Sequence, residues 1–167
     1  MATKKLMYVL FGILALLAWV LGPVIPAGAE TMSYKLYSVV IKSDSFPIGD
    51  VEGHDVVISV RSAFYVFPNE VATAYAFGIR DAIKEAGSFS QYVTLTFPDG
   101  STIIRRDQGT RTGAESSYTS EIIKGTGRFE GIKGTHTAKS KYLPVEKWEA
   151  GPKVIGEGTY TYTLPSK

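Results

Sequence analysis

The stretch Gly125–Gly134 (GTGRFEGIKG) constrains the fold of this chain more than any other. It places four glycines around one aromatic and one aliphatic residue, Phe129 and Ile132. Glycine adopts positive φ and lets another backbone approach closely, so this density of glycine is typical of a strand–turn–strand in a tightly curved sheet. The stretch lacks the Lys-Ser/Thr ending and the following helix of a phosphate loop. It therefore predicts a fold rather than a reaction.

Turn signals recur at short intervals along the rest of the chain, for example at Pro98–Gly100 and at Gly151 and Pro152. The segments between them are rich in Val, Ile, Thr and Tyr, which fit a pleated, half-buried surface. We therefore predict eight strands, near residues 33–42, 54–66, 71–83, 88–97, 101–109, 116–124, 134–142 and 154–164. Strands at this spacing indicate an all-β barrel or sandwich.

The segments 88–97 and 154–164 alternate most clearly between two faces. In the first, one face carries Phe89, Gln91, Val93, Leu95 and Phe97. In the second, one face carries Val154, Gly156, Gly158, Tyr160, Tyr162 and Leu164. Two glycines beside two tyrosines on one face fit a crowded, curved interior.

Residues 69–86 fit two patterns. Val71, Tyr75 and Ile79 belong to a helical stripe that Asn69 and Gly87 could cap. The same residues also alternate with small side chains, as in a strand. The pattern alone does not decide between helix and strand.

The N-terminus has the pattern of a secretory signal peptide. Lys4 and Lys5 precede an apolar run over 6–21, and residues 27–29 (AGA) fit the small-x-small cleavage pattern. The run is 16 residues long, and about 20 are needed to span a bilayer comfortably. We therefore predict a signal peptide over 1–29, export to a bacterial periplasm or the medium, no stable membrane span after cleavage, and a single domain over 30–167.

The exported region is formally neutral. Without Lys4 and Lys5 it carries 16 basic and 16 acidic residues, so nucleic acid is not an expected partner. The chain has no Cys, which removes disulfides, thiol catalysis and thiolate metal sites. It has two His and no carboxylates clustered with them, so no metal and no other cofactor is expected.

Three parts of the sequence resemble the allene oxide cyclase and dirigent barrels, most closely the small exported bacterial proteins with an allene-oxide-cyclase-like barrel domain. Gly125–Gly134 is similar to the Gly-x-Gly-x-Phe-x-x-x-x-Gly signature of these barrels. The segments 87–92 with 96–101, and 158–165, are further similarities in the expected order. The resemblance implies an eight-stranded antiparallel barrel of calycin-like type, whose lumen can take a small apolar molecule. It also favours a strand over 71–83.

The candidate catalytic residues are His54, Arg61, Arg105 and Glu121. His54 is a general base if it is buried on its apolar strand face, and otherwise a hydrogen-bonded structural residue. Arg61 lies in a polar row that is either lumen lining or solvated surface. Arg105 and Arg106 point to opposite faces, so one of them can enter the barrel with Glu121 as its candidate partner, unless they form surface ion pairs. His136, among Thr and Lys residues, is predicted on the strand surface.

The candidate ligand-binding residues are Tyr160, Tyr162, Tyr75 and Trp148. Tyrosine supplies contact area with a polar tip, although it also fills half-buried sheet. Trp148 lies in a polar loop that either covers the barrel mouth or anchors the loop by packing. Gly156 and Gly158 are expected to leave room on one lumen wall.

Three functions follow from these features. The leading hypothesis is an exported barrel that binds a small apolar or aromatic molecule in its lumen. The second is a cofactor-free cyclase or isomerase of the allene oxide cyclase type. The third is a packed structural barrel that acts through its surface. The sequence does not decide whether the chain assembles as a dimer or a trimer.

Prediction on processing. If residues 1–29 form a cleaved signal peptide, N-terminal sequencing of the exported protein begins at Glu30. Recovery of intact Met1 in a membrane fraction would show instead that the apolar run is an anchor.

Overall fold

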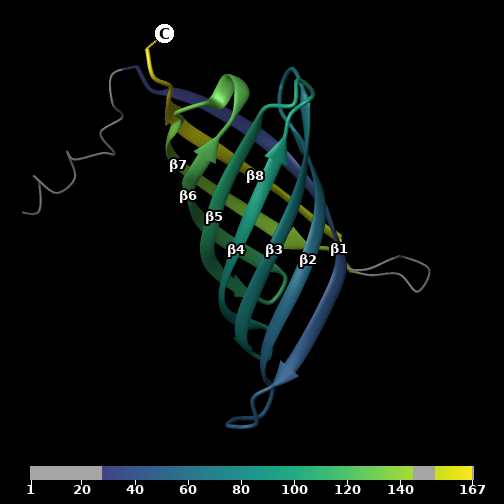
Figure 1. Cartoon of the computed structure of the whole chain (residues 1–167). Coiled ribbons are helices and arrows are strands. Elements are labelled where there is room, and N and C mark those ends of the chain that lie inside the picture. The colour runs from purple at the N-terminus through teal and green to yellow at the C-terminus, as the bar shows by residue number, and fades with distance from the viewer. Residues whose placement is uncertain (1–27, 145–152, 167) are drawn as a thin grey trace, which may run out of the picture.

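The computed structural model describes residues 28–144 and 153–166. They form eight strands that close into an antiparallel barrel in sequence order, with the last strand paired to the first (Figure 1). The strands are β1 (Glu30–Pro47), β2 (His54–Val66), β3 (Val71–Ile83), β4 (Ala86–Thr96), β5 (Thr102–Thr112), β6 (Glu115–Gly125), β7 (Lys133–Tyr142) and β8 (Lys153–Thr163). The described residues contain no α-helix, and so none that could cross a membrane.

The predicted all-β, eight-stranded antiparallel barrel is confirmed, and so is a strand over residues 71–83. The largest difference is in β1, which runs to Pro47 instead of ending near residue 42. A register shift between Val40 and Lys42 inserts an extra residue into β1. Such a bulge bends a strand without ending its pairing, so β1 follows β2 along the whole length of β2. The predicted signal peptide falls almost entirely outside the described residues and stays a prediction.

An apolar core fills the half of the lumen that holds the β2–β3, β4–β5 and β6–β7 connections. Phe97 is central, with its ring centroid 5.5 Å from that of Phe67 and 4.7 Å from that of Phe129. Leu95 and Ile103 are fully buried beside these rings. Because the rings fill the cross-section, this half of the barrel is solid.

The glycine-rich stretch connects β6 to β7 and closes the solid end. It forms a short 3₁₀ turn, η1 (Gly127–Phe129), which Figure 1 shows folded over the end of the barrel. A Cβ at Gly125 would lie 2.0 Å from the carbonyl oxygen of Phe129. The backbone therefore passes too close for any side chain, and this close approach brings Phe129 and Ile132 into the core.

Prediction on the glycine turn. Gly125→Ala lowers the free energy of unfolding by about 3 kcal/mol or more, because the added methyl overlaps backbone atoms that cannot move independently. Gly49→Ala is the control: Gly49 has positive φ and no heavy atom within 4 Å of the added Cβ, so it costs only about 1–2 kcal/mol. Urea unfolding measures both. An equal loss in the two variants would contradict the close-packing argument.

Candidate functional site

The other half of the lumen is hollow where small residues line it. On β3 these are Ala74, Ala76 and Gly78. Strands β1, β2, β6 and β7 contribute serines at positions 38, 43, 59, 116 and 140. The result is a cavity of about 230 Å³. Lining residues toward the β1–β2 and β3–β4 turns, such as Val57, Arg80 and Phe89, are half-buried, so the cavity is open to solvent at that end of the barrel.

Three arginines line this cavity: Arg61 from β2, Arg80 from β3 and Arg111 from β5. Arg61 donates to Gln91 Oε1 at 2.5 Å and to the Tyr142 hydroxyl at 3.5 Å. Arg111 donates from Nε to the Gly113 carbonyl at 2.7 Å, and its guanidinium lies 3.8 Å from the centroid of the Tyr142 ring. Two of the three guanidinium groups are therefore held in place by neutral partners.

A fully buried ion pair lies next to the cavity and is linked to it through Gln91, which lines the cavity. Arg105 Nε donates to Asp107 Oδ1 at 2.8 Å, and neither side chain is exposed to solvent. Arg105 also donates to the hydroxyls of Tyr65, at 2.9 Å, and of Tyr160. Asp107 accepts from Gln91 Nε2 at 2.6 Å and from Ser120 Oγ at 2.5 Å. A buried pair is stable only when its remaining donors and acceptors are bonded in this way.

The contacts of Ser120 and His136 fix the proton positions around Asp107. The single hydroxyl hydrogen of Ser120 goes to Asp107, so Ser120 accepts from His136 Nδ1–H, at 2.7 Å. His136 Nε2 is then the acceptor for the Tyr34 hydroxyl, at 2.6 Å. A chain of hydrogen bonds thus runs from Tyr34 through His136 and Ser120 to the carboxylate.

The pKa values agree with this assignment. Burial, and then the charge of Arg105, lowers the pKa of His136 to about 2, so the ring is neutral at ordinary pH. Burial raises the pKa of Tyr34 and of Tyr65 above the ordinary value, so both hydroxyls stay protonated. The cluster therefore holds one net-neutral charge pair and a set of uncharged groups.

Of the residues proposed from sequence, the lumen contains Arg61, Arg105, Tyr160 and Tyr162. Tyr75 is on the outside of β3 and is half-exposed. Trp148 lies outside the described residues. Gly158 leaves no empty space, because a Cβ there would lie 2.4 Å from the Tyr34 hydroxyl. Gly158 therefore makes room for the ring of Tyr34, and Gly156 lies close against β7 at Lys139 and Ser140.

His54 and Glu121 lie on the outside of the barrel. His54 donates from Nδ1 to Asp50 Oδ1 at 2.5 Å and from Nε2 to Asp81 Oδ1 at 2.8 Å. These hydrogen bonds to Asp81, then Asp50, raise the pKa of His54, so it is stabilised as a cation at the rim and not as a buried base. Glu121 is exposed and lies 3.8 Å from Arg106. It is therefore not the partner of the lumen arginine.

Two functional positions were missed or misplaced from sequence. His136 is buried, although a strand-surface position was predicted. The surrounding threonines and lysines face outward, and alternation puts His136 on the same face as Ala138. Asp107 was overlooked as the partner of Arg105. Residues two apart on a strand share a face, so the spacing of Arg105 and Asp107 was the available signal.

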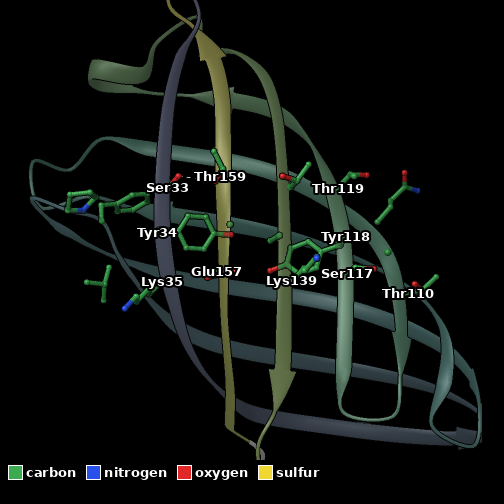
Figure 2. A pocket seen from close by; sticks show the side chains of 18 residues that line it. Ser33, Tyr34, Lys35, Thr110, Ser117, Tyr118, Thr119, Lys139, Glu157 and Thr159 are labelled. Carbon is green, nitrogen blue, oxygen red and sulfur yellow. Dashed lines mark hydrogen bonds between the residues drawn. The ribbon is translucent and has the colours of Figure 1, made fainter. Parts of the chain in front are cut away.

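A second depression, of about 1040 Å³, lies on the outside of β1 and β5–β8 (Figure 2). Exposed polar side chains line it, and Ser33 and Thr159 hydrogen-bond across it at 2.9 Å. It is larger than the lumen cavity but more open, and the charged residues that line it, Lys35, Lys139 and Glu157, are of opposite sign and directly paired across the strands. Among the described residues, no group of three His, Asp or Glu side chains is placed to hold a metal ion.

Fold and lumen together define a small eight-stranded barrel with one solid and one hollow half. No family model matches the sequence, and no match was found among curated proteins. The fold is similar to that of a protein of unknown function from the DUF3224 family of Shewanella oneidensis MR-1, with a TM-score of 0.57, 10% identity, and 83% of this chain and 99% of that chain covered.

Two dirigent proteins are also similar. The pterocarpan synthase dirigent protein PsPTS1 has a TM-score of 0.49 and 17% identity over 83% of this chain and 97% of that chain. GePTS1, of the same description, has a TM-score of 0.47 and 18% identity over 82% of this chain and 91% of that chain. At these identities the likenesses concern the fold alone. The eight-stranded antiparallel barrel that the sequence resemblance implied is the fold observed.

Prediction on the buried pair. Asp107→Asn lowers the free energy of unfolding by about 3–5 kcal/mol, because it leaves the Arg105 charge buried without a counter-charge. Glu121→Gln removes an exposed partner of Arg106 and costs at most about 1 kcal/mol. Denaturant unfolding of both variants measures the difference. Similar losses would mean that Arg105 is not dependent on Asp107.

Prediction on pH. His136 is neutral in the fold, with a pKa of about 2, and has an ordinary value of 6.5 when unfolded. The unfolded chain therefore binds the extra proton between these values, and stability falls as pH drops below 6.5, by about 2 kcal/mol at pH 5. In His136→Gln this part of the pH dependence is absent. His54→Gln is the control, because the raised pKa of His54 makes its contribution fade as pH rises instead.

Proposed function

We propose that this protein is an exported binding protein that holds one small molecule in the hollow half of its barrel. The observation that carries the proposal is the lumen cavity of about 230 Å³. An apolar cavity of about 150 Å³ is large enough for benzene, so this one has room for a molecule built on a single ring. Eight-stranded barrels either fill their lumen or hold one small ligand.

The cavity walls supply both apolar area and polar tips. Leu36, Ala63 and Phe89 contribute apolar surface, and Tyr118 and Tyr142 contribute hydroxyls with ring faces. The tyrosines expected from sequence, Tyr160 and Tyr162, lie in the packed core instead. Ligand contact in the proposal is therefore assigned to the wall tyrosines.

The second candidate is a cofactor-free cyclase or isomerase. Its support is the connection from the cavity to the buried hydrogen-bonded cluster: Arg61 bonds Gln91, and Gln91 bonds Asp107. In such a site the walls would fix the reactive conformer, and Arg61 would stabilise developing negative charge. However, His136 and Ser120 do not line the cavity. Recovery of a chemically changed ligand after incubation would favour the enzyme, and release of the same molecule would favour the binding protein.

We also propose that the barrel forms a homo-oligomer through the outer face of β1–β4. Exposed apolar side chains there are Tyr37, Val39, Phe64, Val66, Val71, Tyr75, Phe77, Ile79, Ile83 and Tyr92. Strand pairing makes them neighbours, for example Val66 beside Val71 and Phe77 beside Tyr92. Contiguous apolar surface of this kind is typical of interaction sites.

Prediction on assembly. Phe77→Asp places a charge on the outer face of β3 without touching the lumen. It converts an oligomer into a monomer with the barrel intact, because an unpaired charge is costly to bury between subunits. Light scattering coupled to size exclusion gives the mass. A monomer for the unmutated chain at high concentration would contradict the proposed oligomer.

Prediction on lumen binding. Ala76→Leu fills the cavity from β3 and removes the ligand that the protein retains when purified from its own host. Thr73→Leu adds a similar side chain on the outside of the same strand and leaves retention unchanged. Native mass spectrometry of the folded proteins detects the bound mass. Equal retention by both variants would place the ligand outside the lumen.

A further inference from the structure

We infer that the lumen ligand is an anion, and that Arg61, Arg80 and Arg111 form the subsite for its negatively charged group. The inference rests on the proposed binding function and names the chemical class: a small organic acid whose carboxylate, phosphate or sulfate is attached to a body no larger than one ring. The position of the three arginines, their partners and the composition of the walls each support it.

The three guanidinium groups enter one cavity from three strands, and no aspartate or glutamate is among the residues that line it. The buried carboxylate of Asp107, which bonds the lining residue Gln91, is already neutralised by Arg105. Glu85, in the β3–β4 turn, interacts electrostatically with Arg80 but is not among the residues that line the cavity. The cavity thus carries an excess of positive charge inside a chain that is formally neutral after the predicted cleavage. Partly buried like charges without a counter-charge are unfavourable unless an anion neutralises them.

Arg80 is the clearest case. Its guanidinium makes no hydrogen bond or ion pair with any described residue, although it is only half-exposed. Burial lowers the pKa of Arg80, and the charges of Arg111 and Arg61 lower it further. A guanidinium in this position has all five N–H donors free for a ligand.

Arg61 and Arg111 are held by neutral groups that leave most of their donors unused. Arg61 donates to Gln91 and Tyr142, and Arg111 to the Gly113 carbonyl while it stacks on Tyr142. None of these partners removes the positive charge. Groups positioned in advance lose little side-chain entropy on binding, and planar guanidinium groups match the oxygens of carboxylate and phosphate.

The remaining wall explains why the ligand has an apolar body. Ala63 and Ala74, with Leu36, face the same volume as the arginines. Inorganic anions alone would leave this surface in contact with water. A ring that carries an acidic group covers the apolar wall and neutralises the arginines at the same time.

The test uses the whole exported chain, freed of retained ligand, and isothermal titration at low ionic strength. Benzoate is the probe, and benzamide is its uncharged counterpart of nearly equal shape. We expect benzoate to bind about tenfold or more tightly than benzamide, and added salt to weaken only the benzoate. Arg80→Gln weakens benzoate about tenfold or more. The control Arg106→Gln, on the outside of the same barrel, leaves its affinity unchanged.

A second measurement separates binding from a structural role. Without ligand and at low salt, Arg80→Gln raises the melting temperature, because it relieves repulsion from Arg61 and Arg111. If Arg80 served only to stabilise the barrel, the same substitution would lower it. Loss of benzoate affinity together with a gain in stability supports the subsite.

The outcomes also separate this inference from the function on which it rests. Equal affinity for benzoate and benzamide, or an Arg80→Gln variant that binds benzoate like the unmutated chain, overturns the anion subsite. So does the failure of both benzoate and inorganic phosphate to bind at millimolar concentration. In each of these cases lumen binding still stands if the retained ligand is lost in Ala76→Leu and kept in Thr73→Leu.

Discussion

The Arg105–Asp107 pair is the interaction on which the interior of this barrel depends. Both residues lie on β5, two positions apart, so the alternation of a strand forces both into the lumen. Two charges removed from water are costly unless every remaining donor and acceptor finds a partner. The hydroxyls of Tyr65, Tyr160 and Ser120 meet that requirement. The middle of the lumen is thereby fixed in one arrangement.

The two halves of the barrel differ because side-chain size changes on either side of this layer. Toward the glycine turn, Phe97 and Phe129 fill the cross-section. Toward the open end, Ala76 and Gly78 on β3 line the lumen together with serines from β1, β2, β6 and β7, and a cavity remains. A barrel of eight strands has an interior just wide enough for side chains to fill, so a layer of small residues leaves a cavity. The hollow half is therefore a consequence of the residues that line it.

Most of the fold could be predicted from the sequence, whereas only part of the site could. Turn residues and alternation are local, so the eight strands were found with small errors at their ends, apart from the bulged β1. The same alternation identified Arg61 and Arg105 as candidates for the lumen. Which carboxylate meets Arg105 depends on cross-strand register, which local patterns do not reveal. Register places Glu121 beside Arg106 on the outer face.

The buried position of His136 was missed because its neighbours in sequence are not its neighbours in the fold. Flanking polar residues suggested solvent, but they occupy the outer face of β7. Its actual partners, Tyr34 and Ser120, come from strands that are distant in the chain or adjacent only after pairing.

Stability and binding place opposite demands on the hollow half. Filling it with larger apolar residues and replacing Arg80 by a neutral residue would remove both a void and a repulsion. The structure instead combines small walls with three cations in one cavity, next to a polar layer in which each charge is paired. The same chain therefore pairs the buried charges at the centre of the lumen and leaves three half-buried cations without a counter-charge one layer away. Packing alone gives no reason for that contrast. The proposed anionic ligand gives one, because it would supply the missing counter-charge and fill the void together.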